Sequence, residues 1–230
     1  MVHKHRDVQG GSARAAVFGI SDGLVSNVAL ILGVAAAASE GSTVLLAGVS
    51  GLLAGAASMA AGEYVSVKAQ GELIERELAI ERVSIAEKPR LETQELTAIY
   101  VARGIDREQA EAMATAVMAD PDVALEVHAR EELGIDPDGV ANPMAAAVSS
   151  FVAFAVGAAL PLLPWFGLSG NVAIVTSVII GLVAALTVGW VLAVFTERSK
   201  VRTALRQAGL AAAACALTWA IGSLLGATVV

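Results

Sequence analysis

Charged side chains are almost absent from four long runs of this sequence. In chain order, the runs are residues 15–39, 41–62, 139–196 and 207–230. Asp22 is the only charged residue in them. A helix that crosses a bilayer needs roughly 20 apolar residues, so the runs have room for one, one, two and one crossings. The two crossings of the third run divide near Pro161, Pro164 and Gly167, which favour a helix end. The sequence predicts an all-α membrane protein with five transmembrane helices.

The basic residues predict how these helices are oriented. All 15 Lys and Arg residues lie before the first crossing, between the second and third, or between the fourth and fifth. Positively charged connections stay on the cytoplasmic side of a membrane. We therefore expect the N-terminus and the long connection after the second crossing in the cytoplasm, and the C-terminus outside. The hydrophobic content of 56% agrees with a chain embedded in a lipid bilayer.

Four regions follow from this division of the chain. They are a cytosolic N-terminal tail (1–13), the first two crossings (14–69), a helical cytosolic insertion (70–140) and the last three crossings (141–230). Between Glu72 and Asp138 the insertion has 17 acids and seven bases, a charge that disfavours nucleic acid as a partner. Helix breakers divide the insertion into three or four helices, at Pro89, Gly104, Pro121 and Gly134. No proline separates its first helix from the second crossing, so one continuous helix is predicted there.

One face of that continuous helix carries metal-ligating side chains. At about 100° per residue, one stripe contains Met59, Glu63, Ser66, Gln70, Glu77, Glu81 and Ser84. Further on, Glu92 and Glu95 form an i, i+3 pair, and a second pair, His128 and Glu132, has i, i+4 spacing. Each pattern alone is also common on a solvated helix surface. Together they predict a divalent-cation site, and imidazole beside carboxylates favours a first-row metal such as Fe²⁺ or Mn²⁺.

Polar side chains also lie within the predicted crossings. Asp22 is the only charge of the first crossing, and Ser26 and Asn27 follow it by about one turn. Glu63 lies near the end of the second crossing, one turn after Met59. An ionised carboxylate in hydrocarbon costs roughly 3 kcal/mol, so it needs a cation, a proton, water or a hydrogen bond between helices. Because a metal ion and a proton compete for one carboxylate, these five residues are predicted to line a pathway that exchanges the two.

These features favour a proton-coupled exporter of Fe²⁺ or Mn²⁺, without a prosthetic group, over two other classes. A membrane enzyme is disfavoured because the sequence has no His-Glu-x-x-His motif and its three histidines lie outside the predicted crossings. A metal-responsive membrane scaffold, which binds metal without transporting it, is the alternative function. Five crossings are few to enclose a pathway, so a homodimer that brings two copies of Asp22 to one axis is predicted.

Three segments resemble the vacuolar iron transporter family, which includes yeast-type vacuolar iron and manganese carriers. They are Ser21–Asn27 (SDGLVSN), Met59–Ser66 (MAAGEYVS) and the stretch from Asn142-Pro143 through Pro164. The resemblance covers nearly the whole chain from about Arg14. It implies a five-span homodimer that exports Fe²⁺ and related ions from the cytosol in exchange for protons. It also implies that Asp22 and Met59 line the path along the dimer axis, with Glu63 close by.

The same resemblance implies a glutamate-rich metal-binding domain in the cytosolic insertion. The positions that match it are Glu81, Glu92, Glu95 and Glu132. Two positions depart from the family pattern, because Ser84 stands where an acid is expected and His128 stands near where some members have methionine. Since no organellar targeting extension is found, we expect a prokaryotic-type protein of the plasma membrane.

Overall fold

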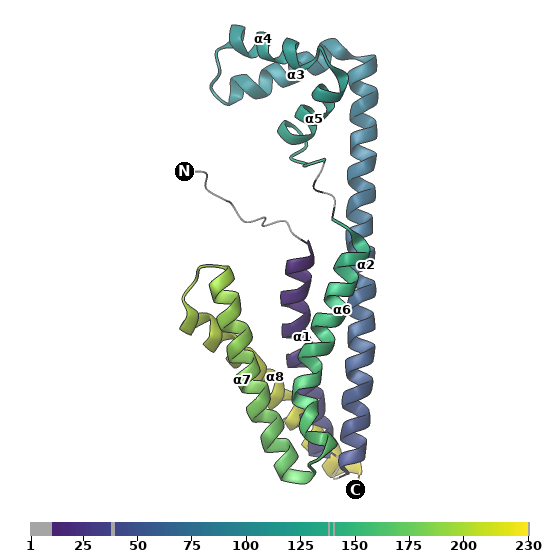
Figure 1. Cartoon of the computed structure of the whole chain (residues 1–230), viewed down its shortest axis with the longest axis vertical. Coiled ribbons are helices and arrows are strands. Elements are labelled where there is room, and N and C mark those ends of the chain that lie inside the picture. Colours follow the sequence, from purple (N-terminus) through teal and green to yellow (C-terminus); the bar gives the residue numbers. More distant parts are fainter. Residues whose placement is uncertain (1–10, 38–39, 138, 140, 230) are drawn as a thin grey trace. The chain divides into compact units, whose positions relative to one another are not determined.

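The computed structural model describes residues 11–37, 40–137, 139 and 141–229 of the chain. All regular elements in these residues are helices, as the sequence predicts. In chain order they are α1 (Gly11–Ala37), α2 (Gly41–Glu87), α3 (Pro89–Ala102), α4 (Arg107–Val117), α5 (Pro121–Glu131), α6 (Pro143–Ala159), the 3₁₀ helix η1 (Leu160–Phe166), α7 (Gly170–Phe195) and α8 (Lys200–Val229) (Figure 1).

Among the residues that the structure describes, five helical segments are long and apolar enough to cross a membrane, which confirms the predicted number. They are Ala15–Ala37, Gly41–Glu87, Pro143–Phe166, Gly170–Phe195 and Lys200–Gly226. The third and fourth segments are separated after η1, which contains Pro161 and Pro164. The last helix begins at Lys200, before the charge-free run that starts at Gln207. Lys and Arg are good helix formers and extend their charged ends toward water, so α8 starts within the basic connection.

The chain divides into two compact units. The membrane unit consists of the described residues up to Val65 together with those from Pro143 onward, and the insertion unit is Ser66–Asn142. Helix α2, with 47 residues, belongs to both units. This continuity agrees with the absence of proline between Met59 and Ile85.

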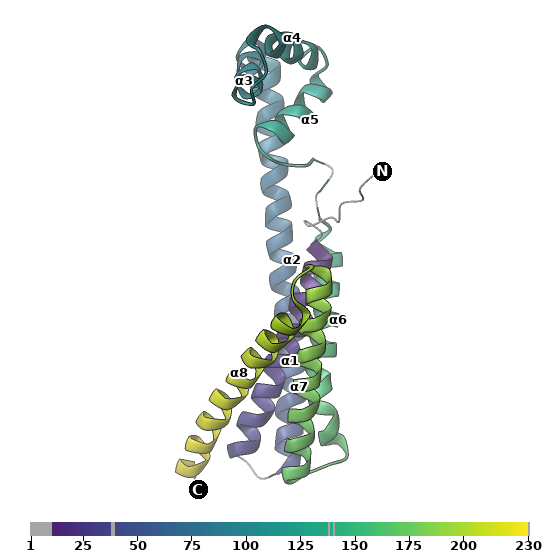
Figure 2. The ribbon, with the colours of Figure 1, turned by 90° about the vertical axis from the view of Figure 1, so that its left-hand side faces the viewer.

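In the membrane unit, α1 contacts α6, α7 and α8 (Figure 2). Glycines allow these helices to approach closely. A Cβ at Gly23 would overlap the backbone of Phe154 in α6, and one at Gly222 would overlap the backbone of Gly33 in α1. Gly19 and Gly23 of α1 form a pair spaced four residues apart, and so do Gly222 and Gly226 of α8. Both pairs serve helix contacts within one chain.

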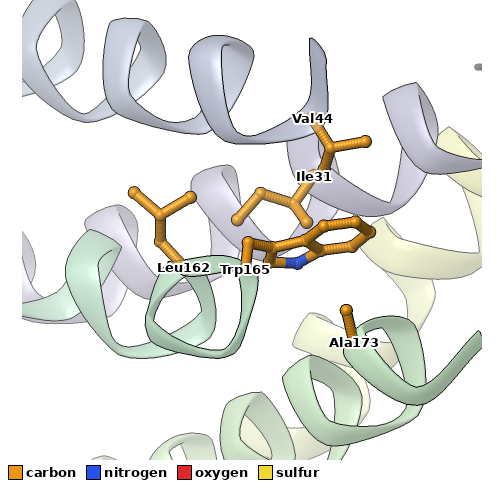
Figure 3. Close-up of a cluster of buried hydrophobic side chains, with 5 residues drawn as sticks. All are labelled: Ile31, Val44, Leu162, Trp165 and Ala173. Carbon is orange, nitrogen blue, oxygen red and sulfur yellow. The ribbon is translucent and has the colours of Figure 1, made fainter. Parts of the chain in front are cut away.

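A cluster of buried side chains joins α1, α2, η1 and α7 in the membrane unit. Figure 3 shows Trp165 of η1 packed among Ile31, Val44, Leu162 and Ala173. The indole Nε1 of Trp165 donates a hydrogen bond to Ser177 Oγ at 2.9 Å, and that hydroxyl donates to the carbonyl of Pro161 at 2.7 Å. The first bond gives the buried indole N–H an acceptor, and the second gives a carbonyl of the proline-containing segment a donor.

The insertion unit has its own small core. Leu96 and Tyr100 of α3 pack against Ala110 and Ala114 of α4, and the side chain of Val127 in α5 adds to them. Alanines at these contacts let short helices pack closely. At the start of α4 the Asp106 carboxylate accepts a backbone N–H at 3.0 Å, which compensates an unpaired donor of the first turn.

Candidate metal site and transport pathway

Four metal-ligating side chains of the insertion unit converge on one point. Glu81 comes from α2 and Glu92 from α3. His128 comes from α5, and Glu132 is the C-cap residue of that helix. One ligand atom of each side chain lies within 4.8 Å of those of the other three. Two ligands on opposite sides of an ion at about 2.1 Å are about 4.2 Å apart, so a small contraction brings all four atoms onto one divalent ion.

Local sequence sets where these side chains fall on their helices. Helix α3 starts at Pro89, whose fixed φ suits the first helical position, and Glu92 follows within the first turn. Helix α5 starts the same way at Pro121, after the Asp120 N-cap, whose carboxylate accepts two backbone N–H groups at 3.0 and 3.3 Å. Fixed helix starts determine the angular position of Glu92 and His128 around their helix axes.

The cluster is largely buried. Glu81 and Glu92 are each 7% exposed and His128 is fully buried, while Glu132 is open to solvent. Within the described residues, no Lys or Arg forms an ion pair with these three carboxylates. Burial raises the pKa of Glu81, and the negative charge of Glu132 raises it further. Burial likewise raises the pKa of Glu92, and Glu95 is the next largest cause. Burial disfavours the ionised form of these carboxylates, and a bound divalent cation would stabilise that form.

The imidazole of His128 lies between two of the carboxylates. Its Nδ1 is 3.2 Å from Glu81 Oε1 and 3.0 Å from Glu132 Oε2. A lone pair on Nδ1 would face two anionic oxygens, so the tautomer with hydrogen on Nδ1 is favoured. Nε2 is buried and has no hydrogen-bond partner among the described residues. A metal ion that binds Nδ1 must displace its hydrogen, so metal and proton compete for this atom.

Three carboxylates and one imidazole form a ligand set of intermediate hardness. Ca²⁺ prefers six to eight oxygen ligands, whereas imidazole suits first-row transition metals, and carboxylate also suits Mn²⁺. The composition of the cluster therefore fits Fe²⁺ or Mn²⁺ better than Ca²⁺.

The two other predicted ligands of the insertion lie outside this group of four. Glu77 is half-buried one turn before Glu81, and its Oε1 is 3.0 Å from Nη1 of Arg76. Glu95 is exposed one turn after Glu92, so this i, i+3 pair has one side chain inside and one at the surface. Glu95 is near enough for its negative charge to raise the pKa of both Glu81 and Glu92.

The five predicted pathway residues line two cavities of the membrane unit. Asp22, Ser26, Asn27 and Met59 contribute to the first, which has a volume of about 360 Å³. Asp22, Met59 and Glu63 contribute to the second, of about 520 Å³. Because Asp22 and Met59 line both, they mark the boundary that the two cavities share.

The polar atoms along this boundary differ in how they are bonded. Ser26 Oγ donates to the carbonyl of Asp22 at 2.6 Å, a bond within one helix turn. Asn27 Nδ2 donates to the carbonyl of Ala158 at 2.7 Å, and its Oδ1 is buried without a hydrogen-bond partner among the described residues. The side chain of Asp22 is exposed on the single chain. A carboxylate, an amide oxygen and the Met59 thioether thus provide a mixed donor set.

The cavities also contain residues that the sequence reasoning did not identify. Ser58 and Phe154 line the first cavity, and Gln207 lines the second, where its amide donates to Ser21 Oγ. Ser58 is next to Met59 and carries a hydroxyl, which is a weak signal in the sequence. Phe154 has no polar atom and comes from α6, so only its packing against the glycines of α1 and α2 reveals its position.

The fold and these sites define a multi-pass membrane protein with candidate metal ligands in both of its units. Residues 13–223 match the VIT family model. The chain is 31% identical over 216 residues to vacuolar iron transporter 1 of Eucalyptus grandis, covering 93% of this chain and 87% of that protein. It is 30% identical over 216 residues to vacuolar iron transporter 1 of Arabidopsis thaliana, covering 94% and 86%. An Acanthamoeba castellanii vacuolar iron transporter is 41% identical over 162 residues, which are 70% of this chain and 58% of that protein's length.

The chain belongs to the VIT family, which confirms the resemblance found in its motifs. Each relative named above is called a transporter, in agreement with the expectation of a transporter rather than an enzyme.

Proposed function

We propose that this chain is a proton-coupled exporter of divalent iron or manganese from the cytosol. The observation that carries the proposal is the boundary between two membrane-unit cavities at Asp22 and Met59. Membership of a family whose members named above are iron transporters supports iron as the cargo. Manganese is supported by ligand chemistry, since carboxylate, amide oxygen and imidazole bind both ions.

The proposed exchange takes place at the Asp22 carboxylate. A divalent ion binds there with the Met59 thioether and Asn27 Oδ1, and it leaves when a proton neutralises the carboxylate. Glu63, in the second cavity, holds the ion before or after this step. A metal ion and a proton compete for the same carboxylate. Outward movement of metal is therefore coupled to inward movement of protons.

In this proposal the insertion unit lies in the cytosol and captures ions. Glu81, Glu92, His128 and Glu132 bind the ion directly. Glu77 and Glu95 add negative charge at the rim, which raises the local concentration of cations. The proposal places the protein in the plasma membrane, with its N-terminus in the cytoplasm and its C-terminus outside. The distribution of basic residues supports this orientation.

A homodimer is part of the proposal. In a single chain the Asp22 side chain is exposed, which is costly for a carboxylate within a membrane span. A second copy packed on this face covers Asp22 and brings two cavities to one twofold axis. Two copies of Asp22 and Glu63 then supply four carboxylates to the pathway.

Transport by purified protein in liposomes tests the proposal, with an internal fluorescent indicator for Fe²⁺ or Mn²⁺ and an imposed pH gradient. Asp22→Asn keeps the side-chain shape and removes the charge, so we expect flux to fall roughly 10- to 100-fold or more. Glu40→Gln removes an exposed acid that lines neither cavity, and should leave flux unchanged.

The same assay separates an exporter from a metal-responsive scaffold. The scaffold is favoured by one observation, namely that the four-residue cluster belongs to the insertion unit, which has its own core, whereas residues of the membrane unit line the two cavities. A scaffold binds metal without flux. Flux that persists in the Asp22→Asn protein would remove Asp22 from the mechanism.

A further inference from the structure

A cavity lined by basic residues lies at the turn between α7 and α8. Its volume is about 700 Å³. Three arginines line it, Arg198, Arg202 and Arg206, together with the hydroxyl-bearing side chain of Thr203 and the acid Glu197. No metal ligand proposed above belongs to it.

The three arginines face this cavity without acidic partners. They are spaced four residues apart, so Arg202 and Arg206 lie on one face of α8 and Arg198 precedes it by one turn. Among the described residues, none of them forms an ion pair, even with the neighbouring Glu197. Three guanidinium groups and one carboxylate leave the cavity with excess positive charge.

A largely buried threonine also lines this cavity. Thr203 is 7% exposed, and its side chain has no hydrogen-bond partner among the described residues. Its burial results from the close approach of two helices, because a Cβ at Gly189 of α7 would lie 2.7 Å from the Cα of Ala204. The Thr203 hydroxyl can therefore exchange a hydrogen bond with a molecule bound in the cavity.

The start of α8 adds backbone donors to this cavity. The first turn of a helix has N–H groups without partners and a partial positive charge. The nearest side-chain cap is weak, since the N–H of Arg202 lies 3.5 Å from Ser199 Oγ. Helix starts of this kind bind phosphate and other oxyanions.

We propose that this cavity binds a phosphate group, either of an anionic lipid headgroup or of a free phosphate. Guanidinium groups match the geometry of phosphate oxygens through paired hydrogen bonds, and the Thr203 hydroxyl can add another. The cavity lies between two candidate membrane spans, where lipid headgroups are found. The tendency of basic residues to stay in the cytoplasm accounts for the charge of this turn. It does not account for the gathering of three arginines and Thr203 around one cavity. The site is independent of the proposed metal transport.

Binding to the purified full chain in a neutral detergent tests this inference. Phosphatidylglycerol, phosphatidylcholine or inorganic phosphate is added, retained lipid is counted by native mass spectrometry, and thermal stability is measured in parallel. The test variant carries Arg202→Gln and Arg206→Gln. The matched control is Lys200→Gln, because Lys200 belongs to the same helix turn but does not line the cavity, and its Nζ lies 5.6 Å from the ring centroid of Trp190.

We expect the wild type and Lys200→Gln to retain phosphatidylglycerol in preference to phosphatidylcholine and to be stabilised by it. The double variant should bind it at least about tenfold more weakly. If that variant does not fold, Arg202→Lys serves instead, since it keeps the charge but loses paired hydrogen bonding and should weaken binding to a smaller extent. Stabilisation by inorganic phosphate alone would identify free phosphate as the occupant. Equal binding in all variants, or no response to either phosphate compound, would overturn the proposal.

Discussion

Replacing Glu92 with glutamine should change metal affinity and fold stability in opposite directions. Glu81 and Glu92 are each 7% exposed, and their ligand atoms lie at most 4.8 Å apart. Two like charges at 4.8 Å repel by about 3.5 kcal/mol at an effective dielectric constant of about 20. The His128 ring and partial protonation offset part of this repulsion. We therefore expect Glu92→Gln to stabilise the metal-free insertion unit by about 1 kcal/mol.

The same substitution removes one of four ligands from the metal site. Loss of a partner that only orients a ligand costs about 10- to 100-fold in metal affinity, so loss of Glu92 itself should cost at least that much. The variant thus has a more stable unit that binds metal more weakly. A residue that is present only for packing would not produce this combination.

Two measurements on the full chain check the expectation. Anaerobic titration with Fe²⁺ and parallel titration with Mn²⁺ give the affinity, and amide hydrogen exchange in α3 and α5 gives the local stability. Stabilisation by about 1 kcal/mol slows exchange about fivefold. Glu111→Gln, an exposed change on α4 outside the cluster, is the control and should alter neither quantity. Faster exchange in Glu92→Gln, or unchanged affinity, would refute the reasoning.

Two further predictions concern pH and helix packing. Protons should displace metal from the insertion unit at a less acidic pH than for ordinary glutamates, because the pKa values of Glu81 and Glu92 are raised above 4.5. For the same reason the metal-free unit should gain stability as pH falls through these raised pKa values toward 4.5. Mn²⁺ titration across a pH series would measure the loss of metal, and hydrogen exchange across the same series would measure the stability. Gly23→Val should destabilise α1 against α6 by about 1–3 kcal/mol or more, measured as thermal stability in detergent. Gly62→Val, with no atom within 4 Å of its Cβ, is the matched control and should lack this packing cost.

The sequence predicted the membrane-spanning part of the fold well, because charge is excluded from lipid and its absence shows directly in the residues. It predicted the separation of the third and fourth spans for a related reason, since Pro161 and Pro164 interrupt backbone hydrogen bonding. The charge-free run from Gln207 located the last span but not the start of its helix at Lys200, because such a run marks the lipid core and not the helix end. Helix contacts such as Gly23 against Phe154 depend on three-dimensional packing and could not be predicted from spacing alone.

Spacing along one helix also predicted only part of the metal cluster. The i, i+4 relation of His128 and Glu132 is local, and their contact at 3.0 Å follows from helix geometry. The contact of His128 with Glu81 joins two helices that are far apart in sequence, so it requires the packing of α5 near α2. A metal site assembled from three helices therefore cannot be derived from any one motif.

One signal in the sequence does separate the buried ligands from the acids at the rim. Glu92, Leu96 and Tyr100 are spaced four residues apart and are all buried, so Glu92 continues the apolar stripe of α3. Glu95 lies off this stripe and is exposed. An acid in phase with a core stripe must be buried when the helix packs, and burial without a basic partner is costly. The position of a glutamate relative to the apolar stripe of its helix, rather than its spacing from another acid, thus indicates which glutamate is buried and needs a bound cation.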